Sequence, residues 1–406
     1  MVESNKLKNP FVGLRTFDEN ESYLFYGRSS QTAFIINQLR KNRFLAAIGS
    51  SGSGKSSLIK SGTIPAVYSG LLESGKTWRV VNVKPGTDPI GNLANAFAFE
   101  GILYDDVAES EFPYKIIIEN TLRRSKQGIT DVYKEAQLPE NVNLLIVVDQ
   151  FEELYRYRQE EKTKASNISD AQHFVELILD ASQQNSVPVF ILITLRSDFL
   201  GECAMFNGLP ELINKGQYLV PRMTRDEVRE VIMKPITIAG GAISARLITR
   251  LLNDVGDNMD QLPVLQHALM RTWDAWIKNA QPNIPMDITN YESVGGWENA
   301  LSNHADEAFN ELNPKTQQPL CEKIFRALSN VSNDGKSTRN PLTILQLAAI
   351  CAATKEEVIK IIEVFRRDDR AFLMPPSNVP LDENSIIDVS HESLLRLWKR
   401  LVQWNE

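Results

Sequence analysis

The sequence predicts an α/β fold, with a doubly wound parallel sheet followed by an all-α helical domain and a winged-helix domain. Residues 44–48, 144–148 and 187–195 are apolar runs, residues 78–83 (WRVVNV) indicate a further buried strand, and stretches of helical pattern lie between them. Continuous apolar runs are typical of parallel strands that helices cover on both faces. A glycine-rich loop directly after the first run strengthens this prediction. After Pro221 the pattern becomes helical.

The glycine-rich loop has the pattern of a phosphate-binding loop, G-x-x-x-x-G-K-[ST], between a strand and a helix. Glycines let backbone N–H groups surround a polyphosphate, and the helix start adds its positive dipole end. Lys55 should reach the β and γ phosphates, and the Ser56 hydroxyl should bind Mg²⁺. The alternative is a Gly/Ser linker that matches by chance. The predicted binding residues of the loop are Gly49, Ser50, Ser51, Gly52, Ser53, Gly54, Lys55, Ser56 and Ser57.

A second part of the phosphate site is predicted at the end of the run 144–148. Asp149 follows this run directly, at the carboxyl end of a strand, where ligands of open α/β sheets bind, and should hold Mg²⁺. Many related ATPases have a glutamate next, but here the residue is Gln150. Glu152 is therefore the first candidate and Glu153 the second for polarising the attacking water. The alternative for both is an exposed acid in a first helical turn.

Arg196 directly follows the apolar run 187–195. Its strand end should also face the phosphates, so its permanently charged guanidinium could sense or stabilise the γ phosphate, with Asp198 orienting it. The alternative is a surface ion pair. These elements together predict a P-loop NTPase of the ASCE/AAA-like kind. The predicted catalytic residues are Lys55, Glu152, Glu153 and Arg196, and the predicted metal ligands are Ser56 and Asp149.

Composition limits the class of protein further. With 406 residues, 43% of them hydrophobic, the chain can form two or three domains with real cores. The net charge of −7 gives no global case for binding nucleic acid or an anionic membrane. Cys203, Cys321 and Cys351 are scattered and odd in number, as expected in a reducing compartment. With no membrane-spanning run and no signal peptide, we expect a cytoplasmic protein.

The chain is predicted to have four parts: an N-terminal segment 1–24, the P-loop NTPase domain 25–221, a helical domain 222–296 and a winged-helix domain 297–406. Aromatic residues and the Gly27-Arg28 pair precede the first strand, and they can either contact an adenine ring or pack an outer helix onto the sheet. No guanine-specifying motif is recognisable, so adenine is favoured.

The region after Pro221 shows helices at 225–233, 246–255 and 264–277, the first with a capping box and the last starting near Pro263. Further helices are expected at 301–312, 319–328, 342–351 and 355–365, followed by a hairpin of 371–374 and 386–389. Three helices and a two-stranded wing describe a winged helix. Residues 301–406 hold 13 basic and 15 acidic side chains, which weighs against nucleic-acid binding. His391 is by default a helix cap or a packed side chain.

Seven motifs together resemble the first novel group of STAND ATPases, and the resemblance covers residues 9–404. They are NPFVGLR (9–15), FYGR (25–28), GSSGSGKS (49–56), VDQFEEL (148–154), LRSDF (195–199), QLPVLQHAL (261–269) and HESLLRLW (391–398). The resemblance implies an ATPase switch in which ADP holds the winged helix on the ATPase core, whereas exchange to ATP permits assembly. Relatives include bacterial antiphage sensors and, more distantly, animal and plant immune receptors.

The resemblance also implies roles for single residues. Pro10, Phe11, Gly27 and Arg28 are similar to the adenine side of the family's site. Pro263 is similar to a helical-domain proline that contacts the base or ribose, although a helix start explains it equally. His391 is similar to the winged-helix histidine that touches the β phosphate in the closed state, and Arg196 to the sensor arginine.

Family members usually carry a long sensor region and an effector domain, and this sequence shows neither. Either the sequence is a shortened chain, or its sensor and effector are separate proteins. We therefore expect an ATP- and ADP-binding, slowly hydrolysing, homo-oligomerising switch of a bacterial defence or conflict system that acts with a partner protein. The alternatives are a scaffold that keeps ADP without turnover and a DNA-loading AAA-like ATPase.

Overall fold

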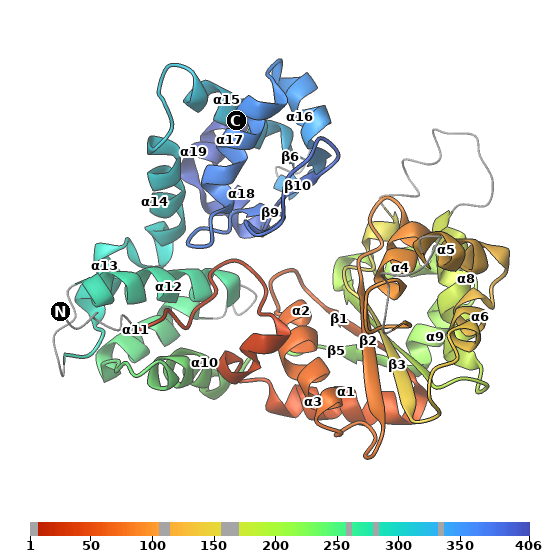
Figure 1. Ribbon diagram of the computed structural model, residues 1–406. Helices are drawn as coiled ribbons and strands as arrows, with labels where there is room; N and C mark the ends of the chain where they lie inside the picture. Colours follow the sequence, from red (N-terminus) through yellow and green to blue (C-terminus); the bar gives the residue numbers. More distant parts are fainter. Residues whose placement is uncertain (1–6, 105–113, 156–169, 257–261, 279–283, 332–336) are drawn as a thin grey trace, which may run out of the picture. The chain divides into compact units, whose positions relative to one another are not determined.

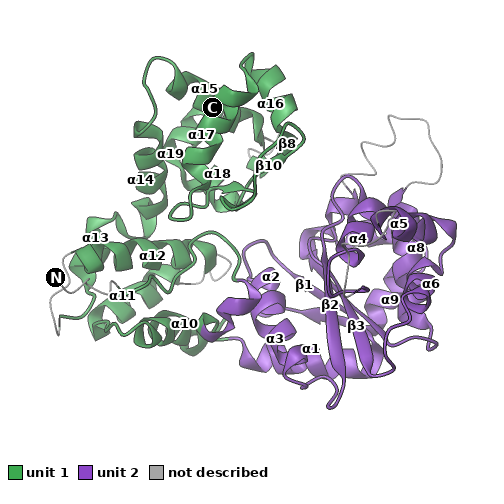
Figure 2. Ribbon diagram, in the orientation of Figure 1, with its two compact units in different colours: residues 1–17, 24–27, 223–406 green, residues 18–23, 28–222 purple. Residues whose placement is uncertain are grey.

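The protein is described by a computed structural model in two compact units (Figure 2). Unit 1 comprises residues 1–17, 24–27 and 223–406, and unit 2 comprises residues 18–23 and 28–222. Within the described residues, no helix has both the length and the apolar character that crossing a membrane requires. The structure describes residues 7–104, 114–155, 170–256, 262–278, 284–331 and 337–406.

The core of unit 2 is a five-stranded sheet with the order β2-β3-β4-β1-β5, in which all neighbouring strands are parallel (Figure 1). Every residue of β1 and β3 is buried, which explains why these strands read as continuous apolar runs. The predicted α/β fold is confirmed. The strands are β1 (Phe44–Gly49), β2 (Thr77–Val83), β3 (Val142–Val148), β4 (Val189–Arg196) and β5 (Gln217–Leu219).

The helices of unit 2 include the stretch that follows the glycine-rich loop and continues without a break through α2, η2 and α3. Helices α4, α5, α6, α8 and α9 share one apolar core with the sheet. The helical pattern expected between the second and third strands is present as α4, α5 and α6, while residues 105–113 lie outside the described residues. These elements are η1 (Glu19–Leu24), α1 (Ser29–Asn42), α2 (Lys55–Ser57), η2 (Leu58–Thr63), α3 (Ile64–Tyr68), α4 (Pro89–Phe97), α5 (Tyr114–Arg124), α6 (Gly128–Glu135), α8 (Asp170–Gln183), η3 (Ser197–Phe199), η4 (Gly201–Met205) and α9 (Leu209–Lys215).

Within unit 1, the described residues between 225 and 310 are mainly helical, as predicted. Thr224 and Glu227 form the expected capping box, each bonding to the other's backbone N–H. Pro263 stands in the first turn of its helix, while Gln261 of the same motif lies outside the described residues. The helices here are α10 (Arg225–Ile238), α11 (Ala245–Val255), α12 (Leu262–Lys278), α13 (Ile288–Ser293) and α14 (Gly296–Asn310).

The last part of unit 1 combines helices with a three-stranded antiparallel sheet of order β8-β10-β9. The predicted hairpin is present as β9 and β10. The helix predicted from residue 342 is wrong by two residues, because Leu342 and Thr343 pair with β10 and the Thr343 side chain caps the helix that follows. The elements are α15 (Gln317–Ala327), β6 (Ser329–Val331), β7 (Ser337–Arg339), β8 (Leu342–Thr343), α16 (Ile344–Cys351), α17 (Lys355–Arg366), β9 (Leu373–Met374), β10 (Ile386–Val389), α18 (Glu392–Leu397) and α19 (Lys399–Asn405).

Candidate functional site

The loop between β1 and α2 has a backbone that only glycine accepts easily. Gly52 and Gly54 have φ angles of +79° and +84°, which lie in the left-handed region. A Cβ atom on Gly49 would lie 2.9 Å from the Oγ atom of Ser53. The Ser53 hydroxyl is itself buried and has no hydrogen-bond partner among the described residues. The loop therefore forms a cradle of backbone groups that suits a phosphate chain.

Lys55 begins the helical stretch after the loop. Its ammonium group donates to the carbonyl oxygens of Gly49 and Ser50, both at 2.8 Å. Burial lowers the pKa of Lys55, and the nearby Glu152 carboxylate opposes this shift. The ammonium is thus held beside the loop, and it interacts electrostatically with Glu152 in the turn that follows β3.

Asp149, directly after β3, is buried and joins two hydroxyl groups. Its Oδ1 atom accepts from Ser56 Oγ at 2.8 Å and from Thr194 Oγ1 at 2.7 Å. A hydroxyl and a carboxylate oxygen side by side are donors that suit Mg²⁺, which commonly keeps several waters as its other ligands. Ser56 and Asp149 therefore stay the predicted ligands. Among the described residues, no group of three or more His, Cys, Asp or Glu could hold a metal ion.

Thr194 is a site residue that the sequence analysis missed. It lies on β4, is buried, and its Oγ1 atom also accepts from the backbone N–H of Gln150 at 2.9 Å. Gln150 has a φ of +59°, which is unusual for a residue with a side chain. The threonine thus holds the turn after Asp149. The signal in the sequence that could have indicated this residue is a single hydroxyl side chain inside the otherwise apolar run 187–195.

The two candidate acids have different surroundings. Glu152 is only 7% exposed, so the alternative of an exposed helix acid does not hold for it. Its Oε2 atom accepts from the backbone N–H of Arg196 at 3.3 Å, and burial raises its pKa against the opposing effect of Lys55. Glu153 instead accepts from the backbone N–H of Gly86 at 3.0 Å, on the loop after β2.

Arg196 ends β4 beside the first glycine of the loop, because Gly49 and Arg196 are paired in the sheet register. Its guanidinium donates to Asp198 at 2.5 Å and lies 5.6 Å from the centre of the Phe199 ring. Burial alone would raise the pKa of Asp198, but the bond from Arg196 lowers it below its usual value. The expected pairing of Arg196 with Asp198 is therefore present, as either interpretation of the arginine requires.

Arg28 is almost fully buried at the start of α1. One guanidinium nitrogen donates to the Ser53 carbonyl at 3.0 Å and another to the Pro221 carbonyl at 2.7 Å. The side chain therefore contacts the phosphate-binding loop through the Ser53 carbonyl. Its role at adenine stays a prediction.

Four further residues from the sequence analysis lie in unit 1. Pro10 is followed by Phe11, which packs in the core formed by α10, α11 and α12. Gly27 has a φ of +77°, and a Cβ atom there would lie 2.8 Å from a carbonyl oxygen of α10. His391 caps α18 by accepting from the Ser393 N–H at 3.1 Å. Packing or capping thus accounts for Phe11, Gly27 and His391, and the contact of all four residues with nucleotide stays a prediction.

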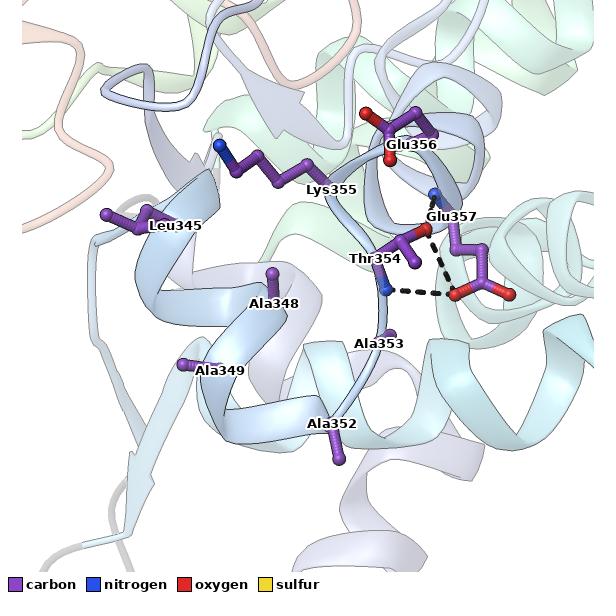
Figure 3. A pocket seen from close by; sticks show the side chains of 9 residues that line it. All are labelled: Leu345, Ala348, Ala349, Ala352, Ala353, Thr354, Lys355, Glu356 and Glu357. Carbon is purple, nitrogen blue, oxygen red and sulfur yellow. Dashed lines mark hydrogen bonds between the residues drawn. The ribbon is translucent and has the colours of Figure 1, made fainter.

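A surface hollow lies at the turn between α16 and α17 (Figure 3). Its polar groups include Thr354 and Glu357, which bond to each other as a capping box. None of the predicted site residues lines it. The lining residues are Leu345, Ala348, Ala349, Ala352, Ala353, Thr354, Lys355, Glu356 and Glu357.

Comparisons with known proteins agree with the resemblance seen in the sequence. The family described as novel STAND NTPase 1 matches residues 10–406. No curated protein matches the chain.

Several solved structures have a similar backbone arrangement, among them the following three. The Aeropyrum pernix ORC1 protein in complex with DNA is 12% identical with a TM-score of 0.46, over 93% of this chain and 92% of that one. The Aeropyrum pernix ORC2 protein in ADPNP-ADP complexes is 10% identical with a TM-score of 0.46, over 99% and 98%. The Thermotoga maritima RuvB Holliday junction branch migration motor is 11% identical with a TM-score of 0.37, over 95% and 98%. Similarity this low carries no argument about function.

Proposed function

Because the chain belongs to the novel STAND NTPase 1 family, we propose that it is an ATP-hydrolysing signalling switch. One observation carries the hydrolytic part of this proposal. The ends of β1, β3 and β4 bring Lys55, Asp149, Glu152 and Arg196 together around one glycine-rich loop. A cation for the phosphates, a metal-binding carboxylate, a buried acid and a guanidinium are the groups that phosphoryl transfer to water requires.

The loop residues 49–57 hold the phosphates through backbone N–H groups, and the ammonium of Lys55 moves from its carbonyl partners to the β and γ oxygens. Mg²⁺, bound by Ser56 and Asp149, would neutralise charge on the same oxygens. Thr194 keeps the Asp149 carboxylate oriented for this task.

Glu152 is the proposed base that polarises the attacking water, and Arg196 stabilises charge on the γ phosphate. The raised pKa of Glu152 is of the kind that suits a proton acceptor. Glu153 supports the site indirectly, by holding the loop at Gly86. Since Gln150 occupies the place of the usual glutamate, we propose slow hydrolysis that acts as a timer.

The remaining roles follow from the family resemblance. We assign the domains 25–221, 222–296 and 297–406 to the NTPase, helical and winged-helix domains, and the β9–β10 hairpin beside three helices supports the last assignment. ADP would hold the switch closed through the residues of unit 1, and a preference of a few kcal/mol is enough to populate one state almost fully. The residues proposed for the base, the ribose and the β phosphate are Pro10, Phe11, Gly27, Arg28, Pro263 and His391.

Oligomerisation with ATP, action in a bacterial defence system of the cytoplasm, and a separate sensor or effector protein complete the proposal. A second candidate, a scaffold that keeps ADP without turnover, is favoured by Gln150. The charge of residues 301–406 does not support a third candidate, a DNA-loading ATPase. Salt-sensitive binding of DNA in a mobility-shift assay would support that function instead.

The first test identifies the nucleotide released when the purified protein is denatured, with the native mass measured in parallel. ADP on a monomer supports the closed switch. The Lys55→Ala variant should carry no nucleotide. Its turnover should fall by about 100- to 1,000-fold, since the substitution removes the positive charge that stabilises the transferred phosphate. Normal nucleotide content and signalling in that variant would contradict the switch. ADP release without any turnover in the wild type would favour the scaffold.

A further inference from the structure

Arg28 links the phosphate-binding loop to the place where the chain leaves unit 2. Its guanidinium donates to the Ser53 carbonyl in the loop and to the Pro221 carbonyl, and its side chain is 2% exposed. Val220 also donates its N–H to Ile48 at 2.7 Å, at the end of the strand that enters the loop. The loop and the segment 220–222 are thus attached at two neighbouring points inside unit 2.

The chain passes between the two units on both sides of this contact. Unit 1 includes Gly27 and unit 2 resumes at Arg28, while unit 2 ends at Arg222 and unit 1 resumes at Met223. On the unit 1 side, Gly27 lies directly against the backbone of Glu227 in the first turn of α10. Within each unit, the chain ends at these two crossings are therefore in contact. Gly27 lies against Glu227 in unit 1, and the Arg28 guanidinium bonds to Pro221 in unit 2.

We propose that Arg28 is a positioning residue that transmits the state of the phosphate-binding loop to the chain crossing at 222/223. A planar guanidinium can hold two carbonyl oxygens in fixed directions, which a single ammonium cannot do. A buried cation that loses one of its partners is strongly destabilised, so a shift of the Ser53 carbonyl draws the guanidinium, and with it the Pro221 carbonyl. The inference rests on the proposed nucleotide binding.

Hydrogen exchange of the full chain tests this link. The exchange of the amides of residues 219–228 is compared in protein without nucleotide, with saturating ADP and with a non-hydrolysable ATP analogue. In the wild type, nucleotide should slow this exchange by about five- to tenfold, the usual size of coupling between sites. In Arg28→Gln the effect should be lost at saturating nucleotide, even where binding is weakened.

Arg40→Gln is the matched control. Arg40 lies on the same helix, and its guanidinium also donates to two carbonyl oxygens, those of Leu71 and Leu72, away from the loop. This variant should keep the nucleotide effect at 219–228. Arg28→Lys keeps the positive charge without the fork and should behave like Arg28→Gln, which separates geometry from charge.

The outcomes are separable. A wild type that binds nucleotide without a change in exchange at 219–228 overturns the inference, and so does an Arg28→Lys or Arg28→Gln variant that keeps the change. If Arg28→Gln does not fold, the wild type and Arg28→Lys decide. A wild type that binds no nucleotide overturns the proposed function itself, and the inference with it.

Discussion

Two buried polar clusters in this protein use ionisable groups in opposite ways. At the phosphate-binding loop of unit 2, Lys55, Asp149 and Glu152 lie close together, and their charges partly offset the cost of burial. In unit 1, His267 and His304 form a hydrogen bond of 3.0 Å between their rings, inside an apolar core. The cluster at the loop therefore buries charges that face one another, whereas the histidine pair is buried in the neutral form.

The histidine pair is neutral at ordinary pH. Burial lowers the pKa of His267 to about 3 and that of His304 further still, with the charge of Arg271 acting in the same direction. Phe372 packs against both rings, with centroids 6.0 Å and 5.1 Å away. The two rings are thus packed as a neutral pair.

The largest expected effect is at the charged cluster. Glu152→Gln should lower the rate of hydrolysis by about 100- to 10,000-fold while nucleotide binding remains, because the amide cannot accept a proton from water. Single-turnover hydrolysis and nucleotide affinity check this. An unchanged rate would exclude Glu152 as the base.

Thr194→Val should weaken the binding of Mg²⁺ by about 10- to 100-fold, as expected when a ligand loses the group that orients it. Valine keeps the shape and removes only the hydroxyl that donates to Asp149. A titration of Mg²⁺ against nucleotide affinity measures the effect. Thr130→Val is the control. Thr130 is buried on α6, and its hydroxyl has no hydrogen-bond partner among the described residues.

The neutral cluster should make the protein acid-sensitive. Both histidines have pKa values below 6.5 in the folded state, so the unfolded chain binds more protons between pH 6.5 and about 3, and stability falls as the pH decreases through this range. The expected loss is about 1.4 kcal/mol per pH unit for each histidine. Urea unfolding at pH 7 and pH 5 measures it, and a double variant with leucine at both positions should lose this part. The same pH dependence in both proteins would contradict the assignment.

The smallest effect is expected for Glu153→Gln, the matched control for Glu152→Gln. The amide oxygen can still accept from the Gly86 N–H, so the variant should lose only about 0.5 to 1.5 kcal/mol of stability. Hydrolysis should change little. A collapse of hydrolysis here, with Glu152→Gln active, would exchange the roles of the two acids.

The sequence by itself determined the parallel sheet, the phosphate-binding loop and the family, because these depend on local patterns. Apolar runs, glycines at fixed spacing and Asp149 after a buried strand can all be recognised within a few residues. The short strands β5 and β8 could not be recognised, because their residues become strands only by pairing with distant segments.

The tertiary structure alone decided the finer arrangement of the candidate site. Thr194 bonds to Asp149 across 45 positions, Arg28 to Pro221 across 193, and Glu153 to Gly86 across 67. The last of these contacts separates Glu153 from its neighbour Glu152, although both stand in one acidic pair in the sequence. Neighbours in sequence can point to different strand ends once the turn at Gln150 is set, and that turn depends on a hydrogen bond from another strand.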